Sequence, residues 1–171
     1  MTSKTAKAKG AERKQRLMEQ IVSKDNLNAA YLQVVRNKGA AGVDGMNVEE
    51  LGAYLWENGE NIREQLKTRK YKPQPVRRVE IPKPDGGTRK LGVPTVVDRF
   101  VQQAVLKALE MMNDGHNWIV DIDLAKFFDT VDHDKMMTIF GRTIKDGDVI
   151  SVVRKFLVSG VMTDDEYEDT I

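Results

Sequence analysis

The sequence predicts an α+β fold that is rich in helices and carries a basic β-hairpin. Three observations support this prediction. In several places along the chain, a residue that can cap a helix is followed by apolar residues at helical spacing. Residues 76–81 and 88–93 have the pattern of two strands around the turn Pro84-Asp-Gly-Gly87, which is typical of a hairpin. Residues 118–124 place Trp118, Val120, Ile122 and Leu124 on one face and Asp121 and Asp123, with Ile119, on the other, as a further strand would.

Each expected helix has a start or a stop signal. A short helix is expected over residues 14–22, and the next is expected to end at Gly39. A third is expected to end at Gly59, with a further helix over residues 61–67. The last residues, 161–171, are expected to form a second hairpin. The expected N-terminal caps are Ser23 or Asp25, Asn47 with Glu50, Thr95 with Asp98, Asp132 or Asp134, and Asp148.

Composition excludes several classes of protein. The chain has 171 residues and no cysteine, so disulfides and thiolate metal sites are excluded. No apolar run reaches the length of a membrane span, and the N-terminus lacks a hydrophobic signal core. We therefore expect a soluble, cytoplasmic protein.

The charges are unevenly spread although the net charge is only +1. Residues 1–16 hold six lysines and arginines against one acid, and residues 63–90 hold ten against three. The last residues are acidic instead. Such blocks present a strong local field to a polyanion. Residues 1–12 are expected to be disordered, either as a solvated tail or as an arm that binds nucleic acid.

Two acids share one face of the expected strand over residues 118–124. Asp121 and Asp123 are two residues apart, so their carboxylates repel each other and favour a divalent cation such as Mg²⁺. Solvated or helix-capping roles remain the alternative. Two aromatics follow, Phe127 and Phe128, and one of them could form the wall of a nucleotide sugar pocket. Otherwise both belong to the core.

The expected hairpin carries cations on both sides of its turn. Lys83 and Arg89 flank the turn closely enough to reach one anion, and an ammonium with a forked guanidinium suits a triphosphate. The glycines do not have the spacing of a Walker loop. A solvated edge or an unspecific phosphate contact is the alternative.

Three strings of the sequence resemble, in the right order, blocks of bacterial group II intron reverse transcriptases. They are Asn26 to Gly45, which ends Ala-Gly-Val-Asp-Gly; Ile81 to Gln102, which begins Ile-Pro-Lys-Pro-Asp-Gly-Gly; and Val120 to His133, which contains Asp-Ile-Asp-Leu-Ala-Lys-Phe-Phe-Asp. The resemblance covers roughly residues 20–171. It implies a right-hand polymerase, with a basic tail and short helix over 1–22, N-terminal extension and fingers over 23–117, and part of the palm over 118–171.

The resemblance also implies an activity and roles for particular residues. The activity is RNA-directed DNA polymerisation, which uses an RNA template, a DNA primer and deoxynucleoside triphosphates. The protein would also bind group II intron RNA and assist its splicing. It would thus be a bacterial protein associated with nucleic acid. Asp123 matches the catalytic aspartate that binds Mg²⁺, with the Leu124 carbonyl as a further ligand. Phe128 matches the aromatic that selects deoxyribose, and Lys83 and Arg89 match the cations that hold the triphosphate.

The sequence departs from the family pattern in two places. After Glu110 the family carries a Tyr-Gly-Phe-Arg-Pro block that this sequence lacks. The Tyr-Ala-Asp-Asp block, which holds the other metal ligands of the family, is also missing from the residues up to Ile171. We therefore expect the chain by itself to be inactive in DNA synthesis. Phosphoryl transfer by two metal ions needs carboxylates from the strand that carries Asp123 and from the strand that carries the Tyr-Ala-Asp-Asp block. A non-catalytic RNA-binding maturase module is the alternative function. A nucleotidyl cyclase-like palm would leave the basic hairpin without a role.

Overall fold

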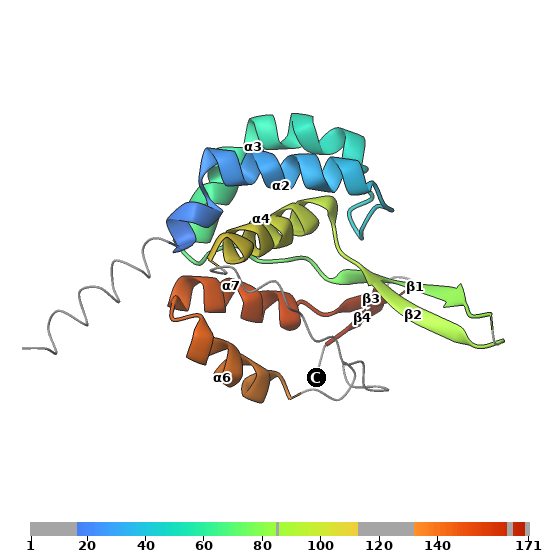
Figure 1. Ribbon diagram of the computed structural model, residues 1–171. Helices are drawn as coiled ribbons and strands as arrows, with labels where there is room; N and C mark the ends of the chain where they lie inside the picture. Colours follow the sequence, from blue (N-terminus) through green and yellow to red (C-terminus); the bar gives the residue numbers. More distant parts are fainter. Residues whose placement is uncertain (1–16, 85, 113–131, 164–165, 170–171) are drawn as a thin grey trace, which may run out of the picture.

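The chain folds as an α+β protein in which a small sheet lies beside a bundle of helices (Figure 1). This computed structural model describes residues 17–84, 86–112, 132–163 and 166–169. The α+β class agrees with the prediction. None of the helices in these ranges is long and apolar enough to cross a membrane.

The first helices begin where the capping signals predict. Residues 17–21 form a helical turn, and α2 (Lys24–Asn37) is capped by Ser23, whose Oγ accepts from the Asn26 amide at 3.3 Å. The capping box of Asn47 and Glu50 is present and opens a 3₁₀ turn, η1 (Val48–Glu50), which leads into α3 (Leu51–Lys67).

The predicted break at Gly59 is wrong, because α3 continues through it. Leu51, Ile62 and Leu66 on this helix are all buried, so its apolar face extends on both sides of the glycine. A glycine inside a helix costs about 1 kcal/mol relative to alanine, which the burial of these side chains exceeds. Tertiary packing therefore overrides the local stop signal.

The long helix α4 (Val96–Met112) confirms both its predicted cap and its predicted inward face. Its first turn is closed by Thr95, whose Oγ1 accepts from the Asp98 amide at 3.1 Å. The predicted inward side chains are all buried: Val97, Phe100, Val101, Ala104, Val105 and Ala108.

The two following helices confirm one predicted cap and correct the other. Asp132 caps α6 (His133–Thr143), as one of the two predicted alternatives. The cap of α7 (Gly147–Leu157) is Asp146, whose Oδ1 accepts from the backbone amides of Asp148 and Val149. Asp148 itself lies inside the helix and forms an ion pair with Arg69. Either aspartate is a suitable N-cap residue, but Asp146 is the one that has the extended backbone of a cap, and Asp148 lies in the first turn.

Both hairpins form, and together they make one sheet. The first consists of β1 (Val76–Pro82) and β2 (Thr88–Val93), and the second consists of β3 (Val161–Thr163) and β4 (Glu166–Glu168). β1 also pairs in parallel with β3, which gives the strand order β2-β1-β3-β4. The β1–β2 hairpin extends away from the helices (Figure 1).

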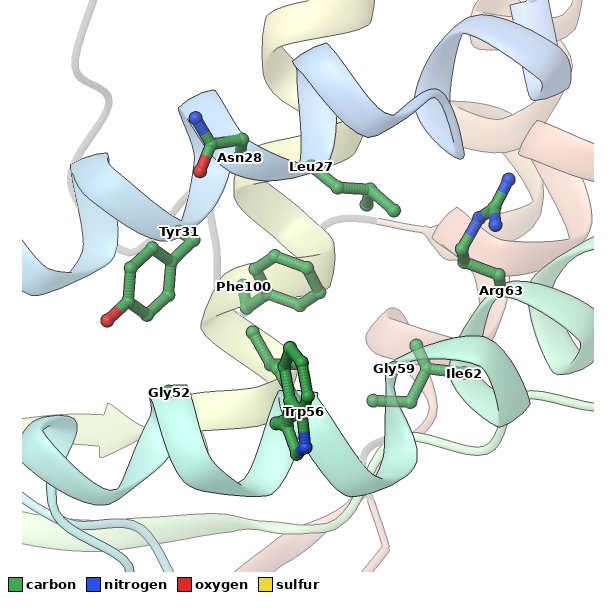
Figure 2. A pocket seen from close by; sticks show the side chains of 10 residues that line it. Leu27, Asn28, Tyr31, Gly52, Trp56, Gly59, Ile62, Arg63 and Phe100 are labelled. Carbon is green, nitrogen blue, oxygen red and sulfur yellow. The ribbon is translucent and has the colours of Figure 1, made fainter.

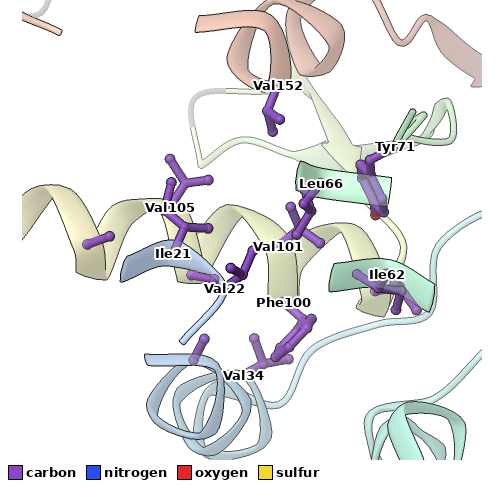
Figure 3. Packing of buried hydrophobic residues seen from close by; sticks show 14 of the residues in the cluster. Ile21, Val22, Val34, Ile62, Leu66, Tyr71, Phe100, Val101, Val105 and Val152 are labelled. Atoms are coloured by element: carbon purple, nitrogen blue, oxygen red, sulfur yellow. The ribbon is translucent and has the colours of Figure 1, made fainter. Parts of the chain in front are cut away.

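The helices α2, α3, α4 and α7 share one apolar core around α4. Figure 3 shows Val34 of α2 packed on one side of α4 and Val152 of α7 on the other, with Leu66 of α3 near Val101. All four of these side chains are buried. The core therefore holds α4 rigidly, and β2 leads into α4 after only two intervening residues.

Candidate nucleotide-binding hairpin

The tip of the β1–β2 hairpin brings Lys83 and Arg89 to one face. Ile81 lies opposite Arg89 in the antiparallel register, and Lys83 follows Ile81 by two residues. The ladder continues past the strands, because the Lys83 amide donates to the Gly87 carbonyl at 2.7 Å. Gly86 has φ +88°, a conformation that glycine adopts without strain, and this closes the turn tightly. Since alternate residues of a strand face the same side, the two cations are diagonal neighbours.

The cations at the tip are available to a ligand. Lys83, Arg89 and Lys90 are exposed, and none of them forms an ion pair within the part of the chain that the structure describes. Lys90 lies opposite Glu80 and therefore on the other face of the hairpin from Arg89. A triphosphate could thus meet Lys83 and Arg89 together on one face.

The cations at the base of the hairpin hold the structure together instead. Arg77 donates from Nε and Nη2 to the Ala41 carbonyl at 3.1 and 2.8 Å. Arg78 pairs with the Glu168 carboxylate at 2.8 Å and so links β1 to β4. The arginines at the base of the hairpin are therefore bound within the fold, whereas Arg89 at the tip is exposed.

A buried carboxylate anchors the segment that enters the hairpin. Asp98 is 2% exposed and accepts from Tyr71 Oη at 2.7 Å, from the Gln74 amide at 3.0 Å and from Thr95 Oγ1 at 2.8 Å. Burial raises the pKa of Asp98, and these three hydrogen bonds oppose that rise. Burial also raises the pKa of the Tyr71 hydroxyl, which the Asp98 charge raises further. The network ties the chain before β1 to the first turn of α4.

The loop over residues 38–45 is packed tightly against the same helix end. A Cβ at Gly42 would lie 2.6 Å from Thr95 Cα, so only glycine allows this approach. Arg99 donates from Nη1 to the Lys38 carbonyl at 3.0 Å and from Nη2 to the Ala40 carbonyl at 2.9 Å. Loop, hairpin base and α4 therefore form one supported unit, which holds the hairpin by its base.

These supporting roles are not visible in the sequence. Asp98 and Thr95 carried the signal of a helix cap, which is correct but incomplete. The partners Tyr71 and Gln74 lie 27 and 24 residues before Asp98, and no local pattern joins them to it.

Comparisons with known proteins find several relatives of this chain. No family model matches the chain. Protein YkfC of Escherichia coli is 32% identical over 85% of this chain and 48% of its own length. The group II intron-encoded protein LtrA of Lactococcus lactis is 28% identical over 91% of this chain and 31% of its own length. The putative COX1/OXI3 intron 1 protein of Saccharomyces cerevisiae is 31% identical over 69% of this chain and 16% of its own length.

The chain is a relative of group II intron-encoded proteins. This confirms the family that the three sequence blocks predict. The chain spans less than half the length of each of the three proteins named above.

The palm residues that the sequence predicts lie outside the described residues. They are the expected metal ligands Asp123 and Leu124 and the expected sugar-pocket residue Phe128. Within the ranges that the structure does describe, no three acidic or histidine side chains gather closely enough to hold a metal ion. These three roles stay predictions.

A hollow whose chemistry differs from that of the hairpin tip lies between α2 and α3. Its volume is about 400 Å³, and Phe100 of α4 points into it from between the two helices (Figure 2). Trp56 stands at its edge and is 91% exposed. The guanidinium of Arg63, which also lines it, is held by Glu60 and by the Val22 carbonyl. The hollow is mainly apolar, unlike the hairpin tip.

Proposed function

We propose that the chain forms the fingers and the first part of the palm of a reverse transcriptase that also binds group II intron RNA and assists its splicing. The observation that carries the proposal is the position of Lys83 and Arg89, exposed on one face of a hairpin tip. The relationship to group II intron-encoded proteins supports it. The substrates would be an RNA template, a DNA primer and deoxynucleoside triphosphates.

The hairpin tip has the chemistry to hold a triphosphate. A guanidinium offers two parallel N–H donors to phosphate oxygens, and an ammonium adds a mobile point charge beside it. The base of the hairpin is fixed by Arg77 and by the Asp98 network. Because the cations are attached to a supported element, less freedom is lost when they bind the nucleotide.

The metal and sugar roles rest on the sequence. Asp123 and the Leu124 carbonyl are the proposed ligands of Mg²⁺, which would polarise phosphoryl oxygens when bound. Phe128 is the proposed wall against a ribose 2′-hydroxyl. In a polymerase assay of the full-length protein, Asp123→Asn should abolish DNA synthesis, and Phe128→Ala should raise ribonucleotide incorporation. A Phe128→Ala protein that melts early and still rejects ribonucleotides would place this ring in the core instead.

The hairpin offers a matched pair of variants for testing the nucleotide role. Arg89→Ala should raise the KM for nucleotide about 10- to 100-fold, as expected for loss of a charged hydrogen bond. Lys90→Ala removes the same charge from the next residue on the opposite face and should leave that KM within about twofold. Equal effects of both variants, or an unchanged KM with weaker template binding, would refute the nucleotide role of this face.

A non-catalytic RNA-binding module is the second candidate, and the exposed cations at the tip favour it too. Any polyanion can be attracted by them, and each contact with single-stranded phosphate adds about 0.7 to the salt slope of binding. Assays of DNA synthesis and of RNA binding, made on the unmodified full-length protein and on Asp123→Asn, separate the two candidate functions. If DNA synthesis is absent from the unmodified full-length protein while intron RNA binds to both forms equally, the binding module is the better description.

A further inference from the structure

A second, smaller hollow lies between α2 and α4, and five of its seven lining residues are polar. Its volume is about 220 Å³. It is lined by Val34, Asn37, Lys38, Arg99, Gln102, Gln103 and Leu106. No acid belongs to this lining, whereas one lysine, one arginine and three amides do. Arg99 also supports the loop beside the hairpin base through its bonds to the Lys38 and Ala40 carbonyls, and none of the lining residues belongs to the hairpin tip.

The Arg99 guanidinium in this hollow is fixed but incompletely satisfied. Two of its nitrogens donate to the carbonyls of Lys38 and Ala40, as described above. Its Nε is buried and has no hydrogen-bond partner within the part of the chain that the structure describes. A buried donor without an acceptor is unfavourable, and because this nitrogen is closed to solvent, Arg99 would act on a ligand in the hollow through the positive charge of its guanidinium. Burial lowers the pKa of Arg99, and the nearby Asp44 charge opposes that effect.

The other donors converge on the same space. Asn37 Oδ1 accepts from Gln33 at 3.0 Å, which leaves the NH₂ group of Asn37 available as a donor. Lys38 adopts φ +54°, a backbone conformation that residues other than glycine seldom occupy. Strained backbone of this kind is often found where function requires it. The strain is held here by the Arg99 bond to the Lys38 carbonyl.

One wall of the hollow is apolar and partly open. Val34 is buried, while Leu106 is 49% exposed although it is a leucine. Donors on one side and an exposed apolar side chain on the other match a nucleotide unit, in which a phosphate is joined to a sugar and a base. Free inorganic phosphate would use the donors and leave Leu106 in water.

We propose that this hollow binds one phosphate of a single RNA strand, with the neighbouring sugar or base resting on Leu106. The proposal rests on the RNA-binding part of the proposed function. It extends the RNA contact from the hairpin to the first half of the loop over residues 38–45, where Arg99 holds the Lys38 and Ala40 carbonyls and Arg77 holds the adjacent Ala41 carbonyl.

Isosteric charge changes test the site without disturbing the fold. Gln103→Glu places a carboxylate in the hollow, and Gln65→Glu makes the same change on α3, away from it. The probe is a fluorescent single-stranded oligoribonucleotide titrated with the full chain at several salt concentrations. Gln103→Glu should weaken binding about tenfold at low salt, and Gln65→Glu should stay within about twofold. Equal weakening by the two variants would overturn the proposal.

Two further arms complete the test. Lys38→Met should lower the salt slope by about 0.7, the value for one contact with single-stranded phosphate. An unchanged slope overturns the proposal, as does displacement of the RNA from the hollow by inorganic phosphate at constant ionic strength. Melting temperatures verify that each variant is folded. If the unmodified chain binds no RNA, the proposed function fails; if Arg89→Ala weakens binding while Gln103→Glu and Lys38→Met do not, the hollow alone fails.

Discussion

The buried Asp98 carboxylate joins the segment before β1 to the first turn of α4, which makes it an informative position to change. It accepts from Tyr71 Oη, from the Gln74 amide and from Thr95 Oγ1 at 2.7, 3.0 and 2.8 Å. Asp98→Ala removes all three acceptor contacts and leaves these donors in a site that is closed to water. The change therefore tests whether the network, rather than the surrounding apolar core, holds the hairpin segment to α4.

The expected cost follows from these three contacts. A hydrogen bond to a charged group contributes about 1.5–3 kcal/mol, but the carboxylate also loses hydration when it is buried. The net loss for Asp98→Ala should thus be about 3–5 kcal/mol, the range for breaking a buried charged network. For a chain of this size, the melting temperature should fall by roughly 6–20 °C.

Asp98→Asn is the matched control. It keeps the shape and one carbonyl acceptor, and the Tyr71 oxygen can accept from the new amide, so the loss should be about 1 kcal/mol. Unfolding by urea, followed by circular dichroism, measures both variants. If Asp98→Ala melts within about 2 °C of the unmodified protein, or if the two variants are equally unstable, the hydrogen-bond reasoning is refuted.

Two further predictions concern pH and glycine. Because burial raises the pKa of Asp98, folding favours its protonated form. The stability advantage of the unmodified protein over Asp98→Asn should therefore be largest below the ordinary aspartate pKa, and should shrink as pH rises through the folded pKa; urea unfolding at several pH values measures it. Gly42→Ala should cost about 1–3 kcal/mol or more, because its Cβ would meet the Thr95 backbone. Gly59→Ala, in α3 with open space at its Cβ, should instead stabilise by about 0.5–1 kcal/mol, and melting temperatures compare the two.

Local signals predicted the local structure well. Ser23, Asn47 and Thr95 cap or open helices as predicted, because each cap depends on residues within three positions along the chain. The limits of β2 also agree, because the turn before it and the proline after it are visible in the sequence. For the candidate site, the same local information placed Lys83 and Arg89 on either side of the turn. Their shared face follows from the register that the structure shows.

What the sequence did not predict depends on residues that are distant along the chain. The parallel pairing of β1 with β3 begins at Val76 opposite Val161, and no local pattern records it. The same is true of the Asp98 network and of the hollow at Arg99, which needs the end of α2 beside the start of α4. The hairpin tip is recognisable because its residues are adjacent, whereas the groups that hold it in place come from α4, from the loop before η1 and from the far hairpin. A sequence pattern can therefore suggest which side chains meet a ligand, but the geometry of their support determines how firmly those side chains are held.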